Sequence, residues 1–440
     1  MIKRYTIPVM TENFSDKKKY ERWFDVEIAV VEALEEAGSC PKGTAKEMRE
    51  TAIIDPARIA EIETETGHDV QSFVDQVRET LRPEIQQYFH KDTTSTDTTE
   101  NAMVMTVLDA LVTTMLFVSQ LAEEVRHQAF KYEYEIMMGR THTQHAEPTT
   151  LGLYLTTCYD MLVRSQERLQ AAYEQMAFGK IRGAVGAYGP SLNPKIEELA
   201  LSKLTPRIQP VKTCLQIILR DRLARVMCEL AVLAGALENM AVNIRLAAQT
   251  EVGELQEPFS AKRKGSSKMP HKRNTDRTEN VTGLARVVRA NASVALENIV
   301  TWRERDISHS GTERIIVEDS FHLVGFMLQR MKGIVYGLVV NEGIIHLNLH
   351  LTHGVTMSPE VKRLLMEEGI EPEQAYRIAQ ELAFKALKKG LQYSAVLLGS
   401  DLIPDSLKLS KIPALFDMKR YTHHVDAIFE RVFGSSEKTT

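Results

Sequence analysis

The fold of this chain is decided by residues 97–138, which read DTTENAMVMTVLDALVTTMLFVSQLAEEVRHQAFKYEYEIMM. This segment contains no Pro and no Gly, and its apolar residues recur every three or four positions, which predicts one long α-helix. We expect Asp97 to cap its start and Gly139 to end it. About forty helical residues at ~1.5 Å each span roughly 60 Å, which is more than a compact domain needs. So long an apolar stripe must pack against other helices, and the segment therefore predicts a helical bundle.

Helical patterns continue on both sides of this segment. Long helices are expected over residues 148–178, 211–251 and 276–309, and a shorter one over 372–389. Strands are scarce, and residues 181–188 (IRGAVGAY) are the candidate for a short extended segment. The sequence is therefore that of an all-α protein.

Three segments are expected along the chain. HGVTMSPEV, at residues 353–361, has the composition of a hinge. We predict a helical N-terminal domain at 1–110, a central long-helix bundle at 111–353 and a helical C-terminal domain at 354–440. One chain supplies only about four or five long helices, so partner chains are expected to contribute others.

Composition excludes several classes of function. A net charge of −5 over 440 residues argues against a nucleic-acid binder, which is usually strongly basic. The N-terminal MIKRYTIPVM lacks the apolar core of a signal peptide, and no run approaches ~18 uninterrupted apolar residues. We therefore expect a soluble cytoplasmic protein without a membrane partner. The cysteines lack CxxC spacing, which fits a reducing compartment and offers no thiolate metal site: Cys40, Cys158, Cys214 and Cys228.

One short loop carries most of the chemical information. Residues 265–274 read GSSKMPHKRN, so hydroxyls and a flexible Gly precede Lys272 and Asn274. An ammonium, an amide and backbone N–H groups can close over an anion, and cations can activate Ser266 as a nucleophile or base. The alternative is a solvated basic surface loop, because six Lys and Arg residues lie between 262 and 273.

Four other polar clusters allow both a functional and a structural interpretation. Thr94-Ser95-Thr96-Asp97 binds anions at a helix start or merely caps it. GRTHTQHAEP, at 139–148, offers His142 and His145 as acid–base groups or as structural histidines, and no carboxylate at ligand spacing supports a metal site. WRERDISHSGTER, at 302–314, suits a phosphate or a salt-bridged surface. The pair His68-Asp69 is weak evidence by itself.

Taken together, these motifs resemble the adenylosuccinate lyase family from residue 4 to about residue 377. The wider fumarase/aspartase superfamily shares three of them: TSTD at 94–97, GRTHTQHAEPTT at 139–150 and GSSKMPHKRN at 265–274. The features specific to the family are Arg4-Tyr5, HDV at 68–70, Gln216 ahead of RDR at 220–222, and ERDISHSGTER at 304–314.

The resemblance implies a fold, an assembly and a reaction. The family is a homotetramer in which long helices form a multi-helix core and three subunits contribute to each site. The reaction eliminates fumarate from a small-molecule substrate, a succinylated purine nucleotide. Adenylosuccinate gives AMP, and succinylaminoimidazole carboxamide ribotide (SAICAR) gives its carboxamide (AICAR), in purine biosynthesis. No metal or organic cofactor is implied.

The resemblance also implies residue roles. Ser266 would be the general base that removes the Cβ proton, while Lys272 and Asn274 hold the carboxylate on which charge develops. His142 would protonate the leaving nitrogen, with Glu279 holding its imidazole. His68 would position the substrate near its phosphate and is the second candidate for the acid. The implied substrate-binding residues are Arg4, Tyr5, Asp69, Thr94, Ser95, Gln216, Asn274, Arg305, Ser310 and Arg314.

The chain departs from the family pattern at four positions. Asp92 and Thr143 stand where the family has Gly, Thr275 where it has Pro, and Thr278 where it has Ser. None of these removes a proposed catalytic group. Thr275 bears on loop closure, and Asp92 adds negative charge near a carboxylate site.

Two other functions compete with this interpretation. The first is a paralogue acting on another dicarboxylate, such as a carboxymuconate cycloisomerase, although such a substrate has no phosphate for Arg305 and Arg314 to bind. The second is a non-catalytic helical tetramer, which the intact set of Ser266, Lys272 and His142 disfavours.

Overall fold

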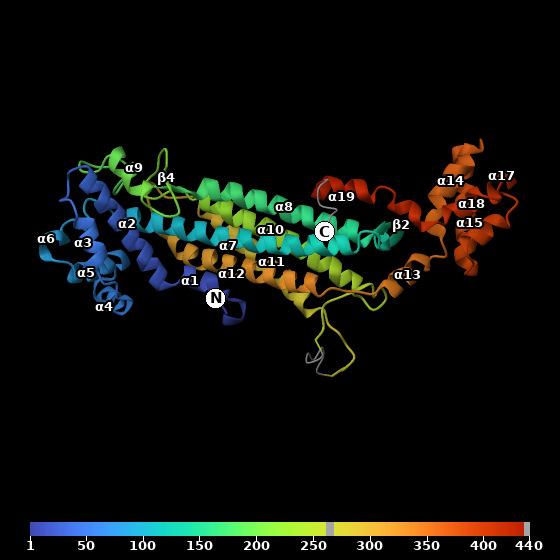
Figure 1. Cartoon of the computed structure of the whole chain (residues 1–440), viewed down its shortest axis with the longest axis horizontal. Helices are drawn as coiled ribbons and strands as arrows, with labels where there is room; N and C mark the ends of the chain where they lie inside the picture. The colour runs from blue at the N-terminus through green and yellow to red at the C-terminus, as the bar shows by residue number, and fades with distance from the viewer. Residues whose placement is uncertain (261–267, 435–440) are drawn as a thin grey trace. The chain divides into compact units, whose positions relative to one another are not determined.

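The computed structural model describes residues 1–260 and 268–434 of the chain. These residues form nineteen α-helices and six short strands, which confirms the predicted all-α class (Figure 1). The chain divides into two compact units. Unit 1 comprises Met1–Gln120, Val163–Glu238 and Val281–Arg330. Unit 2 comprises Leu121–Leu162, Asn239–Asn280 and Met331–Thr440.

Five long helices form the predicted bundle. They are α7 (Ser95–Lys131), α8 (Leu151–Met176), α10 (Asp221–Ala247), α11 (Asp276–Glu297) and α12 (Ser308–Tyr336). Within unit 1, Arg289 of α11 lies 2.6 Å from Glu238 of α10, and Asn291 of α11 donates to Ser320 of α12 at 3.0 Å. These helices therefore run side by side, as Figure 1 shows.

Shorter helices complete unit 1. They are α1 (Pro8–Asn13), α2 (Asp16–Glu36), α3 (Thr44–Thr51), α4 (Pro56–Thr66), α5 (Asp69–Thr80), α6 (Pro83–Gln86) and α9 (Pro194–Ser202). An aromatic cluster joins α2 to α5, where Phe73 packs on Tyr20 and Trp23 with ring centroids 5.9 and 5.5 Å apart. The predicted strand at 181–188 is wrong. The extended pair in that region is β3 (Phe178–Gly179) with β4 (Gln209–Pro210), which run parallel.

Unit 2 contains two antiparallel strand pairs and the C-terminal helices. The pairs are β1 (Ile136–Thr141) with β2 (Gln144–Thr150), and β5 (Leu255–Gln256) with β6 (Val339–Val340). The helices are α13 (Glu342–His350), α14 (Ser358–Glu367), α15 (Pro372–Lys389), α16 (Tyr393–Leu398), α17 (Asp405–Lys408), α18 (Lys411–Leu415) and α19 (Val425–Phe433). Helix α15 confirms the prediction for 372–389, and its apolar face packs in a core with α14, α16 and α18.

The β1–β2 hairpin corrects the predicted end of the longest helix. Helix α7 ends at Lys131, and residues 136–138, predicted as its last turn, belong instead to strand β1 of the hairpin. Gly139 does not end a helix. It lies where the strand register shifts, and a Cβ atom there would come within 2.7 Å of the Glu147 carbonyl oxygen. The close approach of the two strands therefore requires glycine at this position.

Two other long helices are shorter than predicted. The pattern over 276–309 resolves into α11 and α12, separated by residues 298–307. Asp306 defines the new start, because its carboxylate accepts the N–H of Ser308 at 2.8 Å. The pattern over 211–251 becomes α10, which begins at Asp221 after a loop. In both places the loop next to the helix continues the hydrophobic spacing of that helix.

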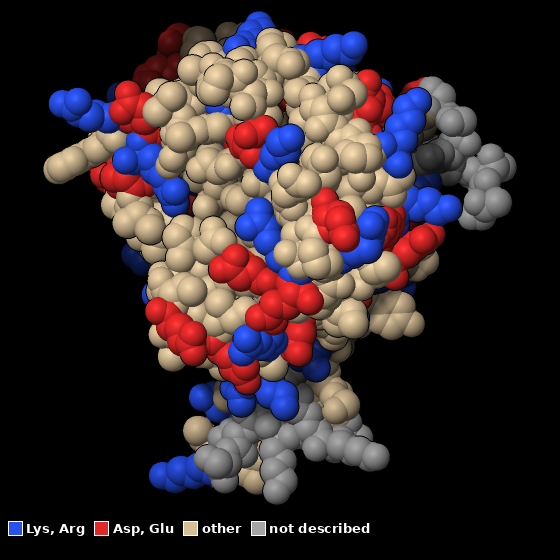
Figure 2. Space-filling view, turned by 90° about the vertical axis from the view of Figure 1, so that its left-hand side faces the viewer, with Lys and Arg blue, Asp and Glu red and all other residues tan. Residues whose placement is uncertain are grey.

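Charge on the surface is mixed. Figure 2 shows blue and red side chains interspersed over broad uncharged areas, with no continuous basic face in that view.

Two helices, α7 and α10, are long and apolar enough to cross a membrane by length and composition. The 18-residue stretches of α7 and α10 that meet these criteria are 56% and 39% buried within the chain. Core helices of a bundle meet the same criteria, because their apolar stripes face other helices.

Candidate active site

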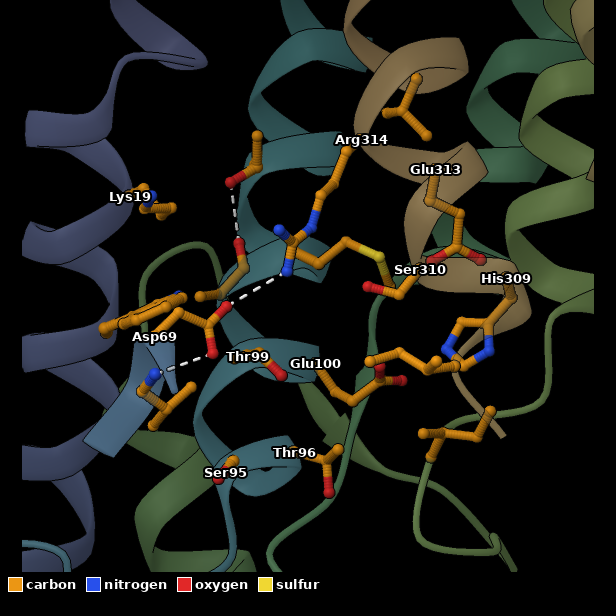
Figure 3. A pocket seen from close by; sticks show the side chains of 18 of the residues that line it. Lys19, Asp69, Ser95, Thr96, Thr99, Glu100, His309, Ser310, Glu313 and Arg314 are labelled. Atoms are coloured by element: carbon orange, nitrogen blue, oxygen red, sulfur yellow. Dashed lines mark hydrogen bonds and ion pairs between the residues drawn. The ribbon is translucent and has the colours of Figure 1, made fainter. Parts of the chain in front are cut away.

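Unit 1 contains a cavity of about 670 Å³ (Figure 3). Its walls come from α2, α5, the start of α7, residues 217–220 and the start of α12. Six of the predicted residues line it: His68, Asp69, Ser95, Arg305, Ser310 and Arg314. The volume is in the range that holds a nucleotide-sized ligand.

The start of α7 is anchored by a buried carboxylate. Asp97 was expected to cap this helix, but α7 begins at Ser95, so Asp97 lies inside its first turn. The Asp97 side chain accepts the N–H groups of Thr94 and Gly183 at 3.0 Å each and pairs with Lys180 at 2.6 Å. Both charged side chains are essentially unexposed. Because Asp97 points inward to this network, the Ser95 hydroxyl and the helix N-terminus are held at the cavity wall.

The start of α12 and the loop just before it supply two guanidinium groups. Arg314 donates to Asp69 at 3.1 Å, yet its side chain remains 69% exposed. Arg305 donates to the Gln216 side chain at 3.2 Å. Ser310 lies on α12 with Arg314, whereas Arg305 precedes the helix, and all three line the cavity. Two guanidinium groups and a hydroxyl facing one space are suited to a phosphate.

His68 also lines the cavity, where it caps α5. Its Nδ1 accepts the N–H of Gln71 at 3.3 Å, and its side chain is 52% exposed. This hydrogen bond leaves Nε2 as the nitrogen that can carry a proton toward a ligand.

Arg4 and Tyr5 lie in a 3-10 helix (Lys3–Tyr5) and are not among the cavity-lining residues. Tyr5 packs edge-on against Phe326 of α12 with ring centroids 5.1 Å apart. Thr94 and Gln216 also lie outside the lining, but each bonds a residue already described, Asp97 and Arg305 respectively.

The cavity wall also holds a buried ionic triad, for which the sequence motifs indicated no role. Arg220 donates to Glu100 of α7 at 2.5 Å and to Glu313 of α12 at 2.8 Å. Glu100, Arg220 and Glu313 are 4%, 3% and 9% exposed, and all three line the cavity together with His309. The sequence signals were Arg220 within RDR at 220–222, and His309 and Glu313, which at i and i+4 share a helix face.

The triad shifts the pKa values around it. Burial raises the pKa of Glu313 to about 7, although the charge of Arg220 opposes the rise. Burial also acts on Glu100, but there Arg220 outweighs it and lowers the pKa. Burial, reinforced by Arg220, lowers the pKa of His309 to about 4. The pKa values of Glu100 and Glu313 are therefore shifted in opposite directions, and His309 is neutral at physiological pH.

Unit 2 holds the second set of predicted residues. His142 and Thr143 are the two-residue turn of the hairpin, with φ of 51° and 65°, and both are exposed. The hairpin is anchored by Arg140, whose guanidinium makes two hydrogen bonds to Glu254 at 2.6 and 2.9 Å. Glu254 is fully buried, so this paired contact fixes the strand that carries His142.

The remaining predicted residues lie near the start of α11. Lys272 is exposed and Asn274 partly buried, while Ser266 lies outside the described residues. Glu279 is exposed in the first turn of α11 and accepts the Thr275 hydroxyl at 3.1 Å. In the described residues of unit 2, Glu279 makes no hydrogen bond to His142.

Unit 1 thus supplies anion-binding groups, and unit 2 supplies an imidazole, an ammonium and an amide. Among residues 1–260 and 268–434, no group of three His, Cys, Asp or Glu side chains is placed to hold a metal ion.

Comparisons with known proteins identify the family of the chain. Residues 3–290 match the family model described as "Lyase", and residues 354–432 match the one described as "Adenylosuccinate lyase C-terminus". The chain is 38% identical to the adenylosuccinate lyase of Aquifex aeolicus over 437 residues, 99% of each chain. It is also 38% identical to that of Bacillus subtilis over 432 residues, covering 98% of this chain and 99% of the relative.

Solved structures show the same fold. A fumarate lyase from Mesorhizobium superposes with a TM-score of 0.88 at 22% identity over 98% of each chain. A 3-carboxy-cis,cis-muconate lactonizing enzyme from Pseudomonas putida gives 0.85 at 26% identity, covering 97% of this chain and 96% of that one. Fold and family match together define an all-α enzyme of the lyase class. Within that class, the chain belongs to the adenylosuccinate lyase family.

Proposed function

We propose that this protein eliminates fumarate from adenylosuccinate to give AMP, and from SAICAR to give AICAR. The observation that carries the proposal is the unit 1 cavity, which Arg305, Ser310 and Arg314 line together with Ser95 and His68. Guanidinium groups at one wall suit a phosphate, and a hydroxyl at a helix N-terminus suits a carboxylate. A succinylated nucleotide carries both.

We propose the following course for the reaction. Ser266 removes the proton from Cβ, while Lys272 and Asn274 stabilise the negative charge that spreads onto the neighbouring carboxylate. The Cβ electrons then form the double bond of fumarate as the C–N bond breaks. His142 donates the proton that the departing nitrogen needs. His68 is the second candidate for this donor, and Glu279 the proposed orienting group of the imidazole.

In the proposed site, the residues of unit 1 and those of unit 2 come from different subunits. Val112 and Leu116 share one face of α7 and are 52% and 54% exposed, which leaves apolar surface for a partner helix. The proposed assembly is a homotetramer whose long helices form one core and whose sites draw on three subunits. We also propose a cytoplasmic place in purine biosynthesis and the domain boundaries at residues 110 and 353. The C-terminal family match at 354–432 supports the second boundary.

Two family departures have a backbone explanation. Asp92 has a φ of 63° and Thr143 a φ of 65°, so both adopt the left-handed conformation that Gly takes without strain. Asp tolerates this conformation better than a β-branched Thr. The other two departures lie at the start of α11. The Thr275 hydroxyl donates to Glu279, and the Thr278 hydroxyl donates to Glu257. None of these positions carries a proposed proton transfer.

The test is an ultraviolet assay of the purified protein with adenylosuccinate and with SAICAR, following fumarate release. We expect turnover of both, and loss of turnover in Ser266→Ala with substrate binding and assembly intact. A Ser266→Ala variant with a near-normal rate would show that the base is another group. Turnover of a carboxymuconate and not of the nucleotides would instead support the dicarboxylate paralogue.

A further inference from the structure

The imidazole of His309 is an unexplained group in the cavity wall. It is 4% exposed, and its Nδ1 is closed off from solvent without a hydrogen-bond partner. Among the described residues the ring makes no hydrogen bond at all, although it lines the cavity. Nδ1 is the only enclosed nitrogen of the ring, so Nε2 is the one that a ligand in the cavity can reach, and no described protein group occupies that hydrogen-bonding position.

The state of the ring follows from its surroundings. A neutral imidazole has one N–H donor and one lone pair that can accept. In proteins, a buried N–H without a partner is rarer than a buried acceptor without one. Because Nδ1 is the enclosed nitrogen, we assign the lone pair to Nδ1 and the proton to Nε2. His309 therefore presents a neutral N–H donor, and Figure 3 shows the ring on the side of the cavity where Glu100 and Glu313 lie.

Charge decides which part of the substrate this donor meets. Beside His309, two carboxylates share the single guanidinium of Arg220, so this wall does not attract an anion. The cations that remain for an anion are the exposed ones: Arg305, and Arg314 at 69%. The phosphate is therefore expected at the guanidinium groups, and an uncharged hydrogen-bonding part of the ligand at His309.

We propose that His309 determines specificity for the nucleotide by donating a hydrogen bond from Nε2 to the nucleoside part of the substrate. The acceptor would be a ring nitrogen or oxygen of the base, or a ribose oxygen. This inference rests on the proposed function, because it takes a nucleotide as the ligand. Ser310, the next residue, would bind the phosphate of the same ligand.

The test compares two substitutions that separate the ring nitrogens. The amide of His309→Gln reaches the position of Nε2, whereas that of His309→Asn reaches only the position of Nδ1. We would measure the Kd of AMP, ribose 5-phosphate and inorganic phosphate by calorimetry for the wild type and both variants. His350→Asn, the same change at an exposed histidine of α13, is the control.

We expect His309→Asn to weaken AMP binding about fivefold, equivalent to ~1 kcal/mol, and His309→Gln to retain most of the affinity. Inorganic phosphate should bind all variants equally. Weakening of AMP alone assigns the contact to the base, and weakening of ribose 5-phosphate as well assigns it to ribose.

Three results would overturn the proposal: unchanged AMP affinity in His309→Asn, equal losses in the Gln and Asn variants, or an equal loss for inorganic phosphate. If His309→Asn does not fold, His309→Leu takes its place, since it also removes the donor. Wild-type protein that binds AMP through His309 without turning over adenylosuccinate would refute the proposed function and leave this inference standing.

Discussion

At the scale of single residues, the Arg220 triad has the largest predicted energetic weight. Replacing Arg220 by Met would leave Glu100 and Glu313 buried without their shared cation. Breaking a buried pair in this way typically destabilises a protein by about 3–5 kcal/mol. We expect that loss in the free energy of unfolding measured by denaturant titration.

The control is Arg377→Met in α15, where Arg377 and Glu373 are 75% and 64% exposed. An exposed pair should contribute only about 0.5 kcal/mol. Similar losses in the two variants would show that the triad has no special role.

Glu313 makes stability depend on pH. Burial raises the pKa of Glu313 from an ordinary value of 4.5 to about 7. Between pH 4.5 and about pH 7, the folded state therefore keeps a proton that the unfolded state has released. Stability must therefore fall as pH rises from about 4.5 to about 7. The lowered pKa of His309 acts in the opposite sense, with stability lost as pH falls from 6.5 to about 4.

Comparison with Glu313→Gln isolates the first effect, because His309 is present in both proteins. Between pH 5.5 and 8.5 the wild type should lose about 2 kcal/mol relative to Glu313→Gln. Unfolding titrations at the two pH values measure this difference. A constant difference, or one of opposite sign, would contradict the assigned pKa.

At the scale of elements, the hairpin turn at His142-Thr143 is strained by its sequence. Two-residue turns with positive φ at both positions favour Asn-Gly, and a β-branched residue is unfavourable there. We expect Thr143→Gly to stabilise the hairpin by about 1 kcal/mol. Hydrogen exchange of the β1–β2 amides would report the change.

Thr149→Gly is the matched control, since Thr149 pairs with Met137 inside the same hairpin. Glycine there should destabilise by about 0.5–1 kcal/mol, because it adds backbone freedom to a strand. Destabilisation by both substitutions would mean that the turn is not strained.

The elements also show what sequence can predict. The long helices were predictable because a period of 3.6 residues repeats over more than twenty positions in α7 and α8. The hairpin was not, because Ile136, Met137 and Met138 continue the apolar pattern of the preceding helix. Strand pairing with Thr149 and Thr150 decides their structure, and that partner is invisible to local periodicity.

In the cavity, too, only residues with a local sequence signal could be predicted. His68, Ser95 and Arg314 could be proposed from motifs that are contiguous in sequence. Arg220 could not be linked to Glu100 and Glu313, which are 120 and 93 positions away, because only the packing of three segments brings them together. Long-range partners of buried charges are set by tertiary structure.

At the scale of the whole molecule, the predicted residues divide between two units. Ser95 belongs to unit 1 and His142 to unit 2. If each site draws on different subunits, Ser95→Ala and His142→Gln chains should complement each other when mixed. Random hybrids of a symmetric tetramer should then recover about a quarter of the wild-type activity.

The measurement is fumarate release after the two inactive variants are denatured, mixed in equal amounts and refolded. Each variant refolded alone is the control. No recovery in mixed tetramers whose hybrid composition is verified would show that each site is built within one chain.

The central claim is that the unit 1 cavity binds the phosphate end of a succinylated nucleotide for elimination. The most direct measurement is kcat/KM of the wild type for adenylosuccinate and for the same compound without its phosphate. We predict fumarate release from adenylosuccinate, with kcat/KM lower by about a hundredfold or more without the phosphate, because two guanidinium groups lose their charge-assisted hydrogen bonds. Equal values for the two compounds, or no turnover of either, would contradict the account.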